Sequence, residues 1–357
     1  MRFSEYFGAW IRAYYANIPL GRDFYTAVSA SKFFGGAIAK YLLQSLELGE
    51  IRLPLNIIDL GANNANLLND ICAFLGTLGV GVVEHCKFIA VESSLHKPSA
   101  KSINFYKNFD ELKNANILQN RHNIFIANEF FDALPCEIID NGKMAFVKNN
   151  RLIFKICDDE KILEICEKFK IAKGEIPLSY DEFCEHIKSE KFMLIAFDYG
   201  DIAPRNDFSL RLFYKHKIQN FADMAFDSQN PQNLHILQNP QNLAQNPQNL
   251  AQNPQNLAQN PQNPQNLSTL FGKCDITYNV PFFVLDRAFE AIGAKKILSK
   301  RQDLALIEDF GILELLQDFY DAQTPHNPSI YLRESNKIKT LLYELSPRFH
   351  AVIYQKQ

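Results

Sequence analysis

The sequence predicts an α/β protein built on an open, mostly parallel sheet with added N-terminal helices. A short apolar run at 57–58 ends in Asp59, and Gly61 and a stretch with helical periodicity follow. This order of strand, tight turn and helix begins a βαβ unit. A second apolar run at 88–91 lies at the spacing that the unit needs, and it also ends in an acid, Glu92. Ligands of such sheets bind at the carboxyl ends of the strands, so the two acids mark a candidate ligand site.

Helices are expected where apolar residues recur every three to four positions. In the first N-terminal segment Phe7, Trp10 and Tyr14 share one helical face, and in the second Phe34 and Ile38 do so. In chain order, the expected helices are 4–15, 31–46, 66–78, 159–171, 179–189, 283–292 and 300–316.

Strands are expected where short apolar or alternating runs lie between turn residues. Asn149 and Asn150 are a favourable turn pair, and they divide the alternating segment 143–156 into a hairpin. The other expected strands are 57–60, 87–91, one unit near 104–109, 123–127, 192–197, 275–282, and a last antiparallel edge strand at 350–354.

These elements suggest four regions along the chain. We expect an N-terminal helical cap at 1–50, an α/β core at 51–227 with the hairpin and helices inserted in it, and the last part of the core at 268–357. Between them, at 228–267, the unit Gln-Asn-Pro-Gln-Asn-Leu-Ala recurs every seven residues. One Leu and one Pro per unit exclude a coiled coil, and Gln, Asn and Pro bury too little apolar area to offset the ordering entropy. We expect a disordered surface loop, with a Pro-rich docking site as the less favoured alternative.

Composition limits the kinds of partner. Hydrophobic residues make up 47% of the 357 residues and charged residues 22%, which suits a globular protein with a full core. The net charge of −3 gives no basic field for nucleic acid. None of the seven cysteines has C-x-x-C spacing, so neither a zinc site nor a redox pair is indicated, and no metal is expected. No apolar run is long enough for a signal peptide or an integral membrane segment, so a cytoplasmic protein is expected.

Polar clusters follow four of the predicted strands, and a fifth lies in the N-terminal loop. Any one of them could be a solvated loop, but four on one edge of a sheet are what a ligand cleft requires. The clusters are Asp59 with Gly61, Glu92, Asn128 with Glu129 and Asp132, Asp198 with Tyr199, and Asp23 with Thr26.

Six short runs coincide with these clusters or lie near them. They are 21–27 (Gly-Arg-Asp-Phe-Tyr-Thr-Ala), 59–61 (Asp-Leu-Gly), 127–135 (Ala-Asn-Glu-Phe-Phe-Asp-Ala-Leu-Pro), 198–200 (Asp-Tyr-Gly), 210–216 (Leu-Arg-Leu-Phe-Tyr-Lys-His) and 275–277 (Asp-Ile-Thr). With them, the chain from about Tyr14 onward, outside the repeat, resembles the MidA/NDUFAF7 family of class I methyltransferases. The run 128–135 is the most specific. The resemblance implies a Rossmann-like sheet of seven strands, S-adenosylmethionine as methyl donor, and a protein partner, an arginine of a respiratory complex I subunit that is methylated during assembly.

The resemblance also implies a role for each cluster. Glu129 and Asp132 match the acidic loop and are the catalytic candidates, because a carboxylate pair can bind and orient a guanidinium. Second candidates, for lining a peptide channel or relaying the proton, are Asp198, Tyr214 and His216. The implied donor site consists of Asp23, Thr26, Asp59, Gly61, Asn63, Glu92 and Asn128.

The chain departs from the family pattern at four positions. Asn63 and Ala65 stand where the family turn has Gly; Asn tolerates a left-handed backbone, whereas Ala adds a methyl group. Arg22 replaces a Gly of the N-terminal loop, and Ser29 replaces an acid that often follows it. A non-catalytic assembly factor with the same fold is the main alternative. A nicotinamide dehydrogenase is less favoured, because G-x-G-x-x-G is absent after the first strand. The oligomeric state stays open, a homodimer included.

Overall fold

The computed structural model describes residues 1–17, 27–93, 102–214, 217–222, 270–323 and 328–357. Several predicted features lie outside the described residues: Asp23, Thr26, His216 and the repeat at 228–267. Of Tyr214, only the backbone is described.

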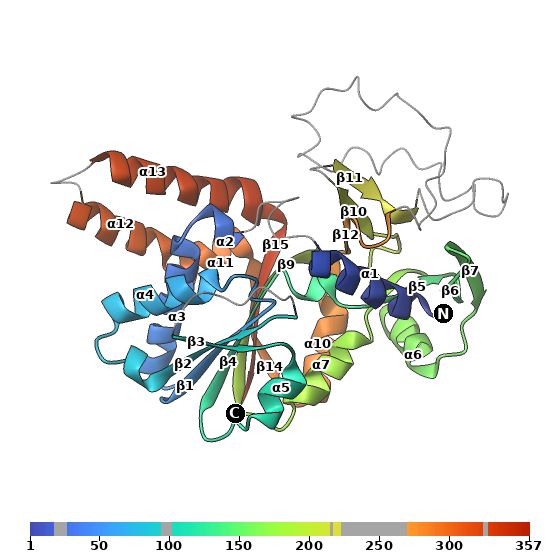
Figure 1. Ribbon diagram of the computed structural model, residues 1–357, viewed down its shortest axis with the longest axis horizontal. Coiled ribbons are helices and arrows are strands. Elements are labelled where there is room, and N and C mark those ends of the chain that lie inside the picture. Colours follow the sequence, from blue (N-terminus) through green and yellow to red (C-terminus); the bar gives the residue numbers. More distant parts are fainter. Residues whose placement is uncertain (18–26, 94–101, 215–216, 223–269, 324–327) are drawn as a thin grey trace.

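An open sheet runs through the middle of the molecule (Figure 1). Its strands lie in the order β14-β15-β9-β4-β1-β2-β3, and the short strand β13 (Val280–Pro281) pairs with β9. Strands β1, β2, β3, β4 and β9 pair in parallel, whereas β15 is antiparallel to both of its neighbours. The strands are β1 (Leu55–Leu60), β2 (Cys86–Val91), β3 (Ile103–Tyr106), β4 (His122–Asn128), β9 (Phe192–Asp201), β14 (Lys295–Arg301) and β15 (Phe349–Lys356). The predicted α/β class with a mostly parallel sheet is confirmed.

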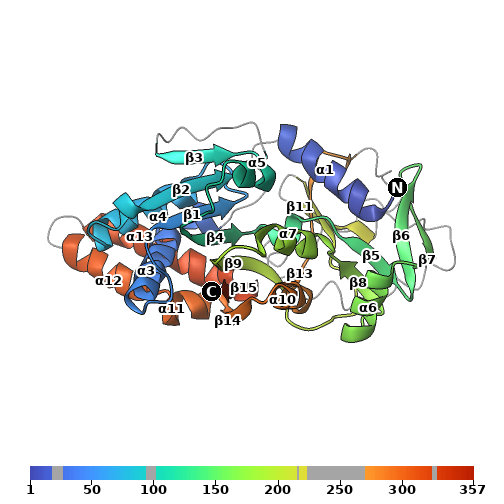
Figure 2. The same ribbon diagram turned by 90° about the horizontal axis from the view of Figure 1, so that it is seen from below.

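Helices cover both faces of this sheet (Figures 1 and 2). Because side chains alternate along a strand, Ile57 of β1 faces one helical layer and Ile58 faces the other. The first layer is α3 (Phe33–Glu47), α4 (Asn66–Leu78), α11 (Gln302–Glu308), α12 (Ile312–Gln323) and α13 (Pro328–Lys339). The second is α5 (Phe109–Asn114), α7 (Ser179–Ile187) and α10 (Phe282–Ala291). Within the described ranges, no helix is both long and apolar enough to cross a membrane.

Two expectations near the end of the chain are wrong. The segment expected as one helix, 300–316, contains the end of β14, then α11 and the start of α12, with Gly311 at φ +63 between the two helices. Charged residues crowd β14, so it lacks the apolar pattern of a strand. The expected edge strand at 350–354 belongs to β15, which lies between β9 and β14. Its side chains alternate between the two helical layers, with Ala351 and Ile353 in one core and Val352 and Tyr354 in the other, which explains its apolar sequence.

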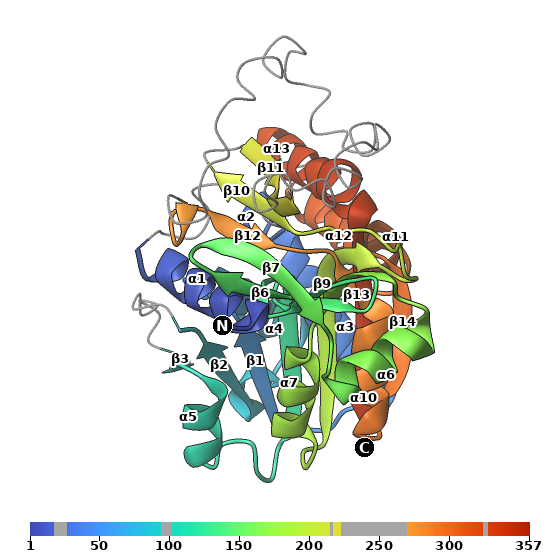
Figure 3. The same cartoon turned by 90° about the vertical axis from the view of Figure 1, so that its right-hand side faces the viewer.

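Two small antiparallel sheets form a second part of the molecule (Figure 3). Helix α1 (Phe3–Asn17) packs against both sheets through Phe3, Phe7 and Trp10. One sheet, in the order β7-β6-β5-β8, contains β5 (Glu137–Asp140), β6 (Lys143–Lys148), β7 (Arg151–Ile156) and β8 (Lys173–Ile176). The other, in the order β11-β10-β12, contains β10 (Arg211–Tyr214), β11 (Lys217–Asn220) and β12 (Asp275–Thr277). The predicted hairpin is confirmed, since Asn149 and Asn150 join β6 to β7 with φ of 51° and 59°.

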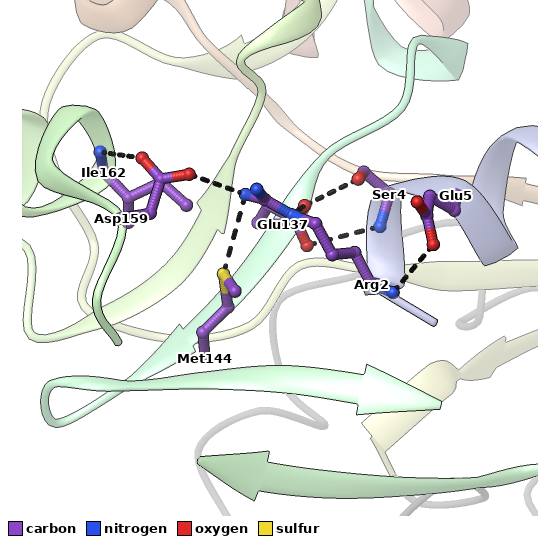
Figure 4. A network of polar contacts seen from close by, with 7 residues as sticks. All are labelled: Arg2, Ser4, Glu5, Glu137, Met144, Asp159 and Ile162. Carbon is purple, nitrogen blue, oxygen red and sulfur yellow. Dashed lines mark hydrogen bonds and ion pairs between the residues drawn. The ribbon is translucent and has the colours of Figure 1, made fainter. Parts of the chain in front are cut away.

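A buried carboxylate fixes the start of α1 (Figure 4). Glu137 of β5 accepts hydrogen bonds from Arg2 Nε and Ser4 Oγ, each at 2.6 Å. Arg2 also donates to Asp159 at 2.9 Å, and Asp159 caps α6 (Glu160–Phe169) by accepting from the Ile162 N–H. The helices of residues 1–50 therefore pack in two places: α1 on the small sheets and α3 on the central sheet.

Candidate active site

The turn after β1 contains three residues with left-handed backbone. Gly61, Asn63 and Ala65 have φ of 72°, 48° and 60°. The N–H groups of Gly61 and Ala62 donate to the Val91 carbonyl, and the Asn63 N–H donates to Glu92 Oε2 at 2.9 Å. The turn is thus folded onto the end of β2, and α4 begins directly after it. The expectation that Asn63 adopts a left-handed backbone is confirmed.

The side of the turn at Gly61 is open. A Cβ built there would meet, among the described residues, only Phe130 Cδ2, at 3.5 Å. Phe130 lies in the acidic loop after β4, so this loop and the turn lie side by side. A glycine with space on this side allows a ligand to approach the backbone closely.

Two neighbouring acids close this end of the sheet. Asp59 and Glu92 are both buried, with 3% and 6% of their surface exposed. Burial raises the pKa of Asp59 to about 8, and the charge of Glu92 raises it further in the same direction. At neutral pH Asp59 therefore carries a proton that it can donate, and Glu92 supplies an acceptor.

The last residue of β4, next to the acidic loop, has a side-chain amide oxygen without a hydrogen bond among the described residues. Asn128 Oδ1 is buried and has no hydrogen-bond partner in the described part of the chain. The amide nitrogen makes one long bond, 3.4 Å, to Glu129 Oε1. A buried acceptor without a partner is costly, so this amide fits a ligand that donates to it.

Glu129 is the most strained residue of this loop. Its φ is 51°, in the left-handed region that non-glycine residues avoid. Its N–H donates to the Phe197 carbonyl at 2.9 Å. Burial, and next the charge of Asp132, raise the pKa of Glu129 to about 8, against smaller effects from Asn128 and the Ala27 N–H. Its carboxyl is mostly protonated at neutral pH.

Asp132 differs from Glu129 in the groups that act on its pKa. It is buried, with 5% exposed, and burial raises its pKa to about 6. A hydrogen bond from Tyr199 and the positive charge of Arg211 oppose that rise. Tyr199 and Arg211 thus favour the charged form of Asp132, whereas the charge of Asp132 favours the neutral form of Glu129. A pair of carboxyl groups in such different surroundings can bind a cation and exchange a proton.

Asp198, a substrate candidate, holds the backbone of this loop. Its Oδ2 accepts hydrogen bonds from the backbone N–H groups of Phe131 and Asp132 at 2.9 and 3.3 Å. Its Oδ1 accepts one from the backbone N–H of Tyr199 at 3.0 Å. It is fully buried, and burial together with the charges of Asp132 and Glu129 raises its pKa well above the ordinary value. Its predicted role in lining a substrate channel stays a prediction, as do the roles of Tyr214 and His216.

Sequence reasoning assigned no role to several polar residues beside Asp132. The Arg211 guanidinium lies 4.6 Å from the centre of the Tyr199 ring, whose hydroxyl is hydrogen bonded to Thr277. Tyr15 of α1 donates to Asp275 Oδ1 at 3.3 Å. Apart from Tyr15, these residues belong to the short runs that carry the family resemblance. Membership of a run was the available signal, but it could not show which strands meet.

A separate hollow lies at the opposite, amino edge of the sheet. It has a volume of about 500 Å³ between the ends of α3 and α4, and Leu43, Leu46 and Leu78 are among its lining residues. None of the candidate residues that the structure describes lines it, so it is not taken as the site of the expected chemistry.

Comparisons with known proteins agree with this geometry. Residues 37–229, more than half of the chain, match the model of a family described as "Putative S-adenosyl-L-methionine-dependent methyltransferase". None of the curated proteins compared with the chain matches it. A Burkholderia thailandensis protein, described as a "likely methyl transferase" and solved with S-adenosylhomocysteine, has a TM-score of 0.66 and 15% identity over 100% of this chain and 88% of its own. A native crystal structure of a protein from the same organism gives 0.66 and 16%, over 100% and 87%. At such identities the two structures show the fold alone.

Proposed function

This chain belongs to the S-adenosylmethionine-dependent methyltransferase family, and from that premise we propose that it methylates an arginine of a respiratory complex I subunit during assembly. The observation that carries the proposal is the position of the acids Glu129 and Asp132 in one loop beside the turn after β1, where Phe130 between them lies 3.5 Å from a Cβ built at Gly61. The subunit as substrate is proposed from the sequence resemblance alone. The cytoplasmic location also remains a proposal, based on composition.

The residues after β1, β2 and β4 suit the donor. Bound S-adenosylmethionine supplies an electrophilic methyl group on a positively charged sulfur. Glu92 and Asp59 offer polar contacts for ribose hydroxyls. Asn128 Oδ1, which has no hydrogen-bond partner among the described residues, is suited to an N–H or O–H of the donor. The open side of Gly61 leaves room for close approach.

An arginine substrate requires a binding site for a cation and a route for a proton. The guanidinium has a pKa of about 12.5–13.8, so it arrives charged and is a poor nucleophile. We assign the binding of this cation to the Asp132 carboxylate, through paired hydrogen bonds. The cation lowers the pKa of the nearby Glu129 carboxyl, so this carboxyl releases its own proton to solvent and becomes a carboxylate that can accept the proton of the substrate. As the N–CH₃ bond forms and the S–CH₃ bond breaks, the proton leaves the nitrogen for a carboxylate of this pair.

Transfer of a labelled methyl group to complex I subunits tests the proposal. Glu129→Gln and Asp132→Asn should each lower the rate by at least about tenfold, because each removes a group that acts in the transition state. Donor affinity, measured by calorimetry, should change little. Glu175→Gln is a matched control. Glu175 is also buried with a raised pKa, but it lies in β8 and accepts a hydrogen bond from Ser209 Oγ.

Two results would contradict parts of the proposal. Full activity in both site variants would remove Glu129 and Asp132 from catalysis. A wild-type protein that binds the donor and transfers no methyl group to any subunit would favour the non-catalytic assembly factor. The family membership leaves no reason to retain the nicotinamide dehydrogenase.

A further inference from the structure

Asp132 is surrounded by residues from strands that lie far apart in the sequence. Tyr199, near the end of β9, is hydrogen bonded to its carboxylate. Arg211 of β10 stacks on the Tyr199 ring at 4.6 Å, and Thr277 of β12 is hydrogen bonded to the Tyr199 hydroxyl. Phe349 packs edge-on against the same ring, with centroids 5.6 Å apart. The Tyr199 side chain is therefore fixed on several sides.

Arg211 is fixed as well. Its Nη2 donates to Asn279 Oδ1 at 2.6 Å, and the Asn279 amide nitrogen donates to Asp201 at 2.9 Å. Its Nε has no hydrogen-bond partner in the part of the chain that the structure describes. The contact with the Tyr199 ring and the hydrogen bond to Asn279 keep the guanidinium close to Asp132. Among the described residues, Arg211 forms no direct ion pair that would neutralise its charge.

We propose that Tyr199 and Arg211 are positioning residues that hold the Asp132 carboxylate in place and balance its negative charge. The inference rests on the proposed function, since Asp132 is assigned there to bind the cationic substrate. Asp198 fixes the backbone of the loop, whereas Tyr199 and Arg211 act on the side chain.

The charges around Asp132 explain why it needs such support. Burial favours the neutral form, while Tyr199 and Arg211 favour the carboxylate. The charged and titratable groups that face it are Glu129 of its own loop, Asp198 and Tyr199 of β9, Arg211 of β10, Tyr278 between β12 and β13, Tyr180 of α7 and Tyr15 of α1. Arg211 supplies the positive charge in this set.

The pH dependence of methyl transfer tests the inference. At about pH 5.5–6, kcat/KM of Tyr199→Phe and of Arg211→Met should be several-fold lower than that of wild type. At pH 8.5 it should lie within about twofold of the wild-type value. The reason is that a raised pKa of Asp132 matters only where the wild-type group is ionised and the variant group is not. Arg211→Lys keeps the charge but loses the flat stacking face, so its loss at low pH should be smaller than that of Arg211→Met.

Matched controls lie outside the site. Tyr354→Phe removes a buried tyrosine hydroxyl that donates to Asp286 at 2.7 Å, and Arg287→Met removes a guanidinium bound to Asp181. Both should leave the pH profile unchanged. A loss in Tyr199→Phe and Arg211→Met that is equal at all pH values, or no loss at all, would overturn the inference.

A direct titration separates this inference from the proposed function. Aspartate side chains labelled with ¹³C give a signal for Asp132 that is identified by its absence in Asp132→Asn. Its midpoint should lie at higher pH in Tyr199→Phe and Arg211→Met than in wild type and both controls. If the midpoint moves but wild type methylates no arginine, the proposed function fails and the positioning role stands. If the midpoint does not move, the positioning role is wrong even where methylation is found.

Discussion

At the scale of single residues, the left-handed Glu129 is the clearest sign of function. A left-handed backbone costs a residue with a Cβ about 1–2 kcal/mol, and Gly or Asn would fit that φ better. A carboxyl group kept in such a conformation supports the catalytic role that we propose for it. Ala65 also has a left-handed backbone, with φ of 60°, and it is fully buried at a position where the family has Gly.

Gly61 allows fold and binding to be separated. Gly61→Ala should cost about 1–2 kcal/mol of stability through the left-handed penalty, and it should also weaken S-adenosylmethionine binding, because the new methyl group takes donor space. Gly142→Ala is the matched control: its φ is 74°, and a Cβ there would have no neighbour within 4 Å among the described residues. It should lose similar stability and keep wild-type donor affinity. Urea unfolding and calorimetry give the two quantities, and equal affinities in both variants would show that the turn does not contact the donor.

Asp59 should make the protein less stable as the pH rises. Its pKa of about 8 in the folded state lies above the ordinary value of 3.8, so between these values the folded state binds more protons than the unfolded state. The free energy of unfolding therefore falls with rising pH, by up to about 1.4 kcal/mol per pH unit from this group, and levels off above pH 8. Urea unfolding of wild type and Asp59→Asn at pH 5.5 to 8.5 checks this. The variant should gain on wild type across that range, and parallel curves would contradict the assignment.

Five candidate site residues could be selected from the sequence because they follow predicted strands. Asp59, Gly61, Glu92, Glu129 and Asp132 each follow an apolar run, and the carboxyl ends of parallel strands meet at one edge. The residues around Asp132 could not be found in this way. Tyr199, Arg211 and Thr277 meet only because strands of two different sheets come together, and no local pattern encodes that contact.

At the scale of elements, the sequence succeeded where one local rule applied. The helix expected at 66–78 agrees with α4, and the turn pair of two Asn residues predicts the β6–β7 hairpin. It failed at β14, where exposed charged residues conceal a strand that pairing with β15 stabilises. The position of β15 inside the sheet also depends on long-range pairing with β9.

The attachment of α1 gives a prediction at this scale. Arg2→Met should cost about 2–3 kcal/mol of stability, because it leaves the buried Glu137 carboxylate with only Ser4 as partner. Arg301→Met is the matched control, since half of the Arg301 side chain is exposed and its pair with Asp303 should contribute much less to stability. Chemical unfolding measures both. Equal effects would mean that the network at Glu137 does not hold the helix.

At the scale of the whole molecule, the repeat lies between two strands of one small sheet. β11 ends at Asn220 and β12 begins at Asp275, and both pair with β10. Deleting 229–266 should leave the melting temperature and donor affinity nearly unchanged, because a Gln/Asn/Pro tract packs little and loop closure changes slowly with length. Replacement by Gly and Ser of equal length separates the effect of length from that of sequence. A large fall in melting temperature in both variants would show that the repeat packs on the fold.

The charged strand β14 also determines how the molecule behaves among its own copies. It forms one edge of the central sheet, where unpaired backbone groups can capture a strand of another chain. Lys295, Lys296, Lys300 and Arg301 belong to this strand, and long charged side chains on an edge strand hinder its pairing with another chain. The sheet is thereby protected from growing across molecules into aggregates, even in a concentrated solution. Any homodimer would have to form through another surface, and exchanging Lys295 and Lys296 for Thr should turn a dispersed protein into one that precipitates.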